Sequence, residues 1–166
     1  MTQTFREGDL EFVFSDAIDG IKFDDATHCL SHCMKAVDFV VELDEKYLFV
    51  EVKDPAHPRA RPQNQAEFQQ DTLDGTLRKE IVTKFRDSFL YRWAEDKLDK
   101  PVIFLSLVTL DEGMVNYFQD EIIRALPLTG SERWTRNIAQ ACIVVNLDAW
   151  NRNFVRWPVH RLSSAQ

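Results

Sequence analysis

The stretch Ala36–Asp54, AVDFVVELDEKYLFVEVKD, reads as two β-strands joined by a tight polar turn. Apolar residues recur on both sides of Asp44–Glu45, and the β-branched and aromatic content favours strand over helix. With Asp44 and Glu45 as the turn, Leu43 pairs with Lys46. The same register places Asp38 directly opposite Glu51 on the neighbouring strand.

This register brings charged side chains to one face of the hairpin. Lys53 follows Glu51 by two residues, so both point to the same face as Asp38. Directly opposed residues have Cβ atoms roughly 4.5–5.5 Å apart, and two carboxylates at that distance repel each other unless a cation lies between them. Mg²⁺ is a hard cation that prefers carboxylate oxygens. The sequence therefore predicts a metal site at Asp38 and Glu51, with Lys53 facing a phosphate or a metal-bound water.

Asp38 on one strand, followed by Glu51-Val52-Lys53 on the next, resembles the motif of the PD-(D/E)xK nuclease superfamily, with Val37 in place of the proline. The resemblance implies a restriction-endonuclease-like core. It also implies that Asp38, Glu51 and the backbone carbonyl of Val52 bind Mg²⁺ or Mn²⁺. Lys53 would orient the attacking water, or help to deprotonate it. The implied activity is hydrolysis of phosphodiester bonds in nucleic acid, with DNA ahead of RNA as the partner.

Other candidate residues lie outside the hairpin. The superfamily commonly adds an upstream acid, for which Asp19 is the candidate, and a solvated turn is the competing interpretation. Arg59 and Arg61, in the proline-rich segment 54–62, are candidate phosphate contacts, although the segment also suits a plain surface connection. Lys84 and Arg86, on the helical region after the hairpin, are further candidates, and the competing interpretation is a solvated helix face.

The remaining sequence predicts one α/β domain over residues 1–166, with a central mixed sheet flanked by helices. The expected elements are a strand at Leu10–Phe14, a helical region over 63–98 that Asp74–Gly75 divides, a strand over 102–108, a helix over 112–126, a short helix over 134–140 and a strand over 141–147. The aromatic and basic tail, 151–161, either binds nucleic acid or packs on the core.

Cysteine and histidine residues gather before the hairpin. His28 and His32 are four residues apart, as are Cys29 and Cys33, which is a spacing found in zinc sites on helices. The two pairs would point about 100° apart on a helix, so a short helix with Cys33 partly buried is the favoured interpretation. Three cysteines predict reduced thiols in a cytoplasmic protein rather than a disulfide framework.

Composition limits the class of protein. Hydrophobic residues make up 45% and charged residues 28%, which is ordinary for a globular domain, and no apolar run is long enough to span a membrane. The net charge of −7 argues against strong non-specific binding to nucleic acid. Two alternatives therefore stay open beside a nuclease that could act as a homodimer. The chain could be a catalytically silent module of the same fold within a larger complex, or the motif could be accidental and its charges exposed.

Overall fold

The computed structural model describes residues 1–25 and 29–165 and has a mixed α/β fold. Its strands are β1 (Gln3–Glu7), β2 (Leu10–Phe14), β3 (Asp19–Lys22), β4 (Phe39–Glu42), β5 (Tyr47–Lys53), β6 (Val102–Val108), β7 (Ala141–Val145) and β8 (Val159–Arg161). Its helices are α1 (Pro62–Asp74), α2 (Thr76–Ala94), α3 (Glu112–Ala125) and α4 (Leu147–Asn153), and a 3-10 helix follows at Leu162–Ala165. None of the described helices is long and apolar enough to cross a membrane.

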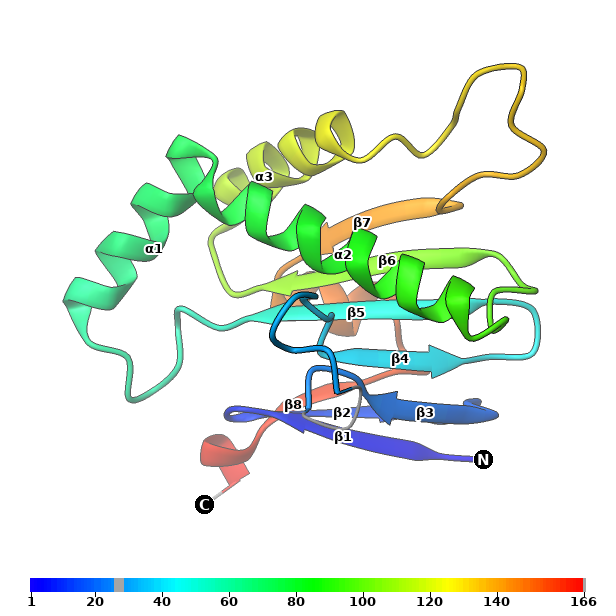
Figure 1. Cartoon of the computed structure of the whole chain (residues 1–166). Helices are drawn as coiled ribbons and strands as arrows, with labels where there is room; N and C mark the ends of the chain where they lie inside the picture. The colour runs from blue at the N-terminus through cyan, green and yellow to red at the C-terminus, as the bar shows by residue number, and fades with distance from the viewer. Residues whose placement is uncertain (26–28, 166) are drawn as a thin grey trace.

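The strands form two sheets (Figure 1). A five-stranded mixed sheet has the order β3-β4-β5-β6-β7, in which β3, β4 and β5 are antiparallel and β5, β6 and β7 are parallel. A three-stranded antiparallel sheet has the order β1-β2-β8. The predicted central mixed sheet is confirmed, and the second sheet joins the two ends of the chain.

The hairpin has the predicted register. Phe39 pairs with Val50, and the Leu43 N–H donates to the Lys46 carbonyl over 2.9 Å. The preceding residue, Asp38, lies just before β4 and therefore opposite Glu51. The first strand is thus shorter than predicted, but the alignment of the two acids does not depend on its length.

Both faces of the five-stranded sheet are covered. On one face, residues such as Phe49 and Phe104 pack under Ile81 and Phe85 of α2 and under α3. On the other face, strand residues pack against the three-stranded sheet and against Trp150 of α4. This double burial explains why the second strand of the hairpin and the stretch 102–108 read as nearly continuous apolar runs.

The helical region after the hairpin is divided where the sequence predicted. Gly75 has φ of +86°, a left-handed conformation that ends α1 and precedes the first residue of α2. The second helix ends at Ala94, before the predicted limit of residue 98. Asp96 adopts φ of +58°, and the Lys97 N–H donates to the Arg92 carbonyl, so the chain turns away there.

In the C-terminal third, the predicted short helix is wrong and the predicted strand is confirmed with a shorter range. Residues 134–140 form bends and irregular backbone instead of a helix, and the Gln140 N–H donates to the Val102 carbonyl at the start of β6. The strand predicted over 141–147 ends at Val145, because the Asn146 side chain caps α4 by accepting from the Ala149 N–H. The aromatic tail docks on the core, and the Trp157 indole donates to Asp16.

Candidate active site

The predicted acid pair converges beneath α2. Asp38 and Glu51 are 3% and 0% exposed. Asp38 Oδ2 accepts from the Val52 N–H over 2.6 Å. Between the two carboxylates lies the ammonium group of Lys84, whose Nζ is 2.8 Å from Glu51 Oε1 and 3.4 Å from Asp38 Oδ1. The cation that this pair requires is therefore supplied by the chain itself in this structure, and the expectation of exposed motif charges is wrong.

The motif lysine lies beside the pair. Lys53 Nζ is 3.2 Å from Glu51 Oε1 and 2.8 Å from Glu80 Oε1 on α2. The acid pair is thus joined to α2 twice, through Lys84 directly and through Lys53 by way of Glu80. Lys53 and Glu80 are both partly exposed, so this side of the cluster reaches solvent.

Two further acids complete the cluster, and neither was singled out from the sequence. Glu7 at the end of β1 and Asp24 just after β3 each offer a carboxylate oxygen within 4.8 Å of one from Asp38. Glu7 is also paired with Lys22 over 2.9 Å. Asp24 has a weak sequence signal, the acidic run around it, whereas nothing in the local sequence distinguishes Glu7.

Four of the predicted residues lie elsewhere. Asp19, the predicted upstream acid, pairs with Glu42 at the far end of β4, and its side chain accepts from the neighbouring Gly20 N–H. Arg86 points to α3, where its Nη2 donates to the Ala125 carbonyl. Arg59 is exposed on the loop after β5 and makes no described contact with either motif acid.

Arg61 precedes α1 and is also exposed, without a described contact to Asp38 or Glu51. Lys84 is therefore the one predicted phosphate contact that the described structure places in the acid cluster.

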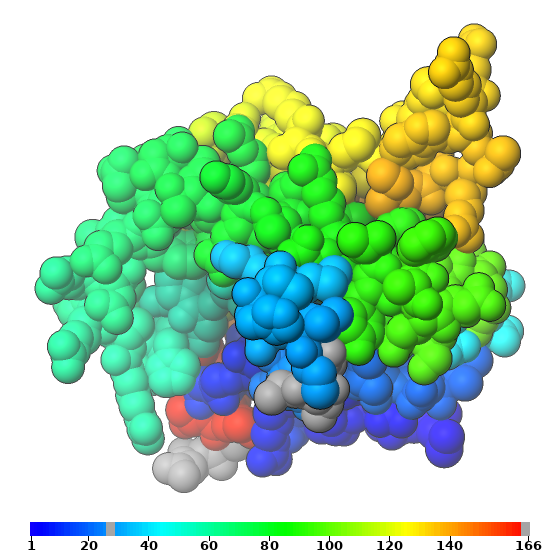
Figure 2. All heavy atoms as spheres, viewed as in Figure 1, coloured from blue at the N-terminus to red at the C-terminus, as the bar shows by residue number. Residues whose placement is uncertain are grey.

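The cysteine–histidine segment carries no site in the described structure. His28 lies outside the described residues. Cys29, His32 and Cys33 are exposed, and Cys29–Cys33 forms turns, so the predicted helix and the burial of Cys33 are wrong for these residues. The following residues dock on α2, where the Lys35 and Val37 N–H groups donate to Asp87 and Ser88. The segment lies against α2 on the face seen in Figure 2, in light blue.

The electrostatics show that the cluster has excess negative charge. Burial, together with the charge of Glu51, raises the pKa of Asp38 to about 7. Burial also raises the pKa of Glu51, although Lys84 and Lys53 oppose the shift. Five carboxylates, those of Glu7, Asp24, Asp38, Glu51 and Glu80, face three ammonium groups, those of Lys22, Lys53 and Lys84. A proton or an added cation would offset this excess.

Both central lysines are ammonium ions at neutral pH. Burial lowers the pKa of Lys84, but the charges of Glu51 and Asp38 outweigh it and raise the pKa above its usual value. The pKa of Lys53 is raised in the same way by Glu51 and Glu80 against burial. In this charge state, Lys53 can donate hydrogen bonds to an anion but cannot take a proton from a water.

The oxygen donors of the cluster are of the kind that a hard divalent cation prefers. Glu51 Oε2 is buried without a hydrogen-bond partner, and the Ser106 hydroxyl, at the paired position on β6, is buried without one as well. Two oxygens bound to the same Mg²⁺ at about 2.1 Å lie at most about 4.2 Å apart. Among three oxygens of an octahedral site at most one pair is opposite, and the other pairs lie about 3.0 Å apart. The Glu7, Asp24 and Asp38 oxygens, which lie within 4.8 Å of one another, would therefore have to move closer together to bind one ion.

Comparisons with protein-family models, with curated proteins and with solved structures found no match for this chain. No relative therefore supplies a role for the residues of the cluster.

Proposed function

We propose that this chain is a metal-dependent nuclease of the PD-(D/E)xK type that hydrolyses phosphodiester bonds in nucleic acid. The observation that carries the proposal is the buried convergence of Asp38 and Glu51 from neighbouring strands, with lysines beside them and one oxygen of Glu51 left without a partner. Such a concentration of desolvated carboxylates is costly unless it binds a cation. Its retention in the core favours a functional role.

The order of elements supports the same proposal. The antiparallel strands β3, β4 and β5 carry the motif, α2 follows and packs over the motif face, and β6 then lies parallel to β5. The resemblance to restriction-endonuclease-like cores leads one to expect a motif hairpin followed by a helix and a further strand.

The metal ligands in this proposal come from the hairpin. Glu51 Oε2 has no hydrogen-bond partner, and Lys84 holds Asp38 Oδ1 over 3.4 Å, more loosely than the Val52 N–H holds Asp38 Oδ2 over 2.6 Å. The N–H and C=O of one strand residue point to the same side, so the Val52 carbonyl faces the side on which Asp38 lies. A bound Mg²⁺ or Mn²⁺ would lower the pKa of a water and offset charge on the phosphate.

The lysines act as cations in this proposal. Metal binding to Glu51 competes with Lys84, which then becomes free to donate to a phosphate oxygen. Lys53 remains tied to Glu80 and orients the attacking water by donating a hydrogen bond to its oxygen rather than by removing a proton.

A second candidate is a catalytically silent module of the same fold that acts within a larger complex. The bridging ammonium of Lys84 favours it, because this group already supplies the cation between the two carboxylates. The two candidates differ in what they require: a nuclease must bind divalent metal at the Asp38–Glu51 pair and cleave a substrate, whereas a silent module does not cleave and need not bind metal.

Calorimetric titration of the chain with Mg²⁺ and Mn²⁺ at pH 8 tests the proposal, with cleavage assays on single- and double-stranded DNA and RNA. We expect saturable metal binding that Asp38→Asn and Glu51→Gln abolish and that Asp19→Asn, an exposed acid on β3, leaves intact. We also expect Lys53→Met to remove cleavage but not metal binding. Metal binding without cleavage of any substrate would favour the silent module, and absence of both would refute the nuclease.

A further inference from the structure

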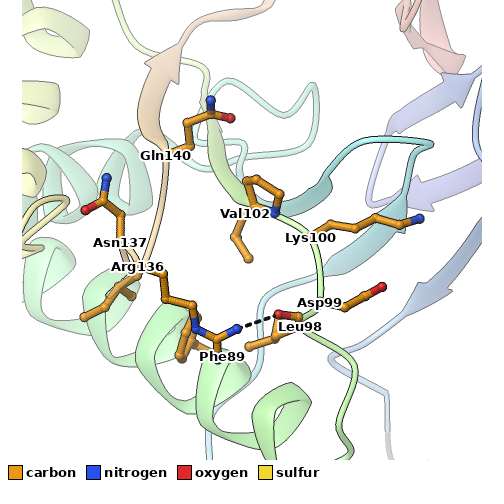
Figure 3. Close-up of a pocket in the computed structure, with 10 residues that line it drawn as sticks. Phe89, Leu98, Asp99, Lys100, Val102, Arg136, Asn137 and Gln140 are labelled. Atoms are coloured by element: carbon orange, nitrogen blue, oxygen red, sulfur yellow. Dashed lines mark hydrogen bonds between the residues drawn. The ribbon is translucent and has the colours of Figure 1, made fainter. Parts of the chain in front are cut away.

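A pocket lies at the opposite end of the five-stranded sheet from the acid cluster. It has a volume of about 320 Å³ and opens beside the start of β6, between the C-terminal half of α2 and the segment that precedes β7 (Figure 3). β6 runs from Val102 in this pocket to Val108, which pairs with Lys53. Glu51 pairs with Ser106, four residues along β6 from Val102, so at about 3.3 Å per residue the pocket is roughly 13 Å from this acid. It is therefore a separate site.

Five of the ten residues around the pocket give it an apolar lining. Phe89, Leu98, Pro101, Val102 and Ile138 form this lining. Val102 and Leu98 are buried, and Phe89 and Ile138 pack against the core under α2. Such a lining accepts a flat or branched apolar body and offers it no hydrogen bonds.

Two hydrogen bonds join the walls to each other. Arg136 Nη1 donates to the Leu98 carbonyl over 2.9 Å, as Figure 3 shows, and the Gln140 N–H donates to the Val102 carbonyl over 2.7 Å. These bonds tie the segment 136–140 to the loop before β6. The pocket is thus formed before a ligand arrives, which reduces the entropy lost on binding.

Among the charged side chains around the pocket, Arg136 is the cation that can pair with a ligand. Lys100 points away from Arg136 and donates to Glu42 and to the Leu43 carbonyl. Asp99 also points away and accepts from the Tyr47 hydroxyl. No carboxylate in residues 1–25 or 29–165 forms an ion pair with Arg136, and its only described hydrogen bond uses Nη1.

The lining extends into a second hollow that adds aromatic surface. This hollow, of about 360 Å³, shares Phe89, Arg136, Asn137 and Ile138 with the pocket and adds Leu90, Trp93 and Trp134. The Trp134 indole lies directly on the backbone of Gly130 and leaves no room there for a Cβ atom. The three added side chains are 41–58% exposed, although each is large and apolar.

From this arrangement we propose that the pocket binds an organic acid with a single negative charge and an apolar, ring-sized body. The carboxylate pairs with the free nitrogens of Arg136, because a guanidinium matches the planar geometry of a carboxylate. The ring lies on Phe89 and Ile138, and the amides of Asn137 and Gln140 at the rim supply further hydrogen bonds. A dianionic phosphate would find only one uncompensated cation, so a monoanion is the better complement. The acid can be a free small molecule or the C-terminal carboxylate of a peptide that ends in an apolar residue.

The test is an NMR titration of the full chain with 3-phenylpropionate, with its neutral amide, 3-phenylpropionamide, and with N-acetylphenylalanine. We expect saturable shifts of the Asn137 and Gln140 amides with 3-phenylpropionate, at a dissociation constant in the millimolar range. The neutral amide should bind about tenfold or more weakly, because it lacks the charge-assisted hydrogen bonds. Tighter binding of N-acetylphenylalanine than of 3-phenylpropionate would identify a peptide terminus as the source, and the reverse would identify a free acid.

Arg136→Gln and Arg133→Gln are the matched variants. Glutamine at 136 keeps a donor for the Leu98 carbonyl but removes the charge, and Arg133 is an exposed arginine on the same segment that does not line the pocket. We expect Arg136→Gln to weaken 3-phenylpropionate binding by about tenfold or more and Arg133→Gln to leave it unchanged. Equal binding of acid and amide, an equal effect of the two variants, or no saturable shifts would overturn the proposal. None of these outcomes depends on nuclease activity.

Discussion

Replacing Asp38 with asparagine should remove a pH-dependent loss of stability. Burial and the charge of Glu51 raise the pKa of Asp38 from 3.8 to about 7 in the folded chain. The folded state therefore binds this proton more tightly than the unfolded state does. The stability that protonated Asp38 contributes is fully present below about pH 4 and is lost as the pH rises through about 7.

The magnitude follows from the same two values. From pH 5 to about pH 7, folded Asp38 keeps its proton whereas unfolded Asp38 has lost it. Over these two pH units the free energy of unfolding of the natural chain therefore falls by about 3 kcal/mol, at 1.36 kcal/mol per unit. The asparagine side chain of the variant cannot ionise, but its oxygen can still accept from the Val52 N–H. Any cost of placing an amide beside Lys84 is the same at both pH values. The free energy of unfolding of the variant, relative to that of the natural chain, should therefore be about 3 kcal/mol higher at pH 8 than at pH 5.

Urea denaturation of both proteins at pH 5 and pH 8, in the presence of EDTA, measures this difference. Asp19→Asn is the matched control, because Asp19 is exposed at the far end of β4 and should show no comparable change. Adding Mg²⁺ at pH 8 should stabilise the natural chain more than Asp38→Asn. If Asp38→Asn and the natural chain differ by the same free energy at both pH values, Asp38 does not lie in a desolvated, repulsive environment, and the electrostatic description of the cluster fails.

Three further perturbations test the site and the core. Lys84→Met should destabilise the chain by about 3 kcal/mol at pH 8 in EDTA, because it leaves two buried carboxylates without their bridging cation. Added Mg²⁺ should recover part of this loss in the same urea titration, and a neutral effect would show that Lys84 is not the counter-ion. Phe85→Ala should cost about 3–5 kcal/mol in urea denaturation, since Phe85 is fully buried against Phe49 and Phe104; a cost under about 1 kcal/mol would contradict this packing. Gly75→Ala should lower stability by about 1 kcal/mol in thermal unfolding because Gly75 has φ of +86°, whereas an increase in melting temperature would argue against the left-handed junction between α1 and α2.

Neighbouring residues on α2 show the limit of prediction from sequence. Lys84 and Arg86 were equal candidates for contact with a phosphate, but two residues on a helix differ by about 200° in direction. Lys84 points into the acid cluster, whereas Arg86 reaches the end of α3. Which side of α2 faces the hairpin depends on Leu77, Ile81 and Phe85 packing on the sheet, and the periodicity of the sequence does not say which strands lie beneath them.

Sequence reasoning was sufficient to predict the hairpin, its register, the alignment of Asp38 with Glu51 and Lys53, and the break at Gly75. These features depend on residues close together in the chain, through side-chain alternation, a short turn and one special backbone conformation. The folded chain was needed to show that the acid pair is surrounded by Glu7, Asp24, Glu80 and Lys84 and that segment 134–140 is irregular. Those outcomes depend on packing between segments that are distant in the chain. Burial of apolar side chains determines which segments pack together, and the positions of the charged groups on these segments follow from that packing.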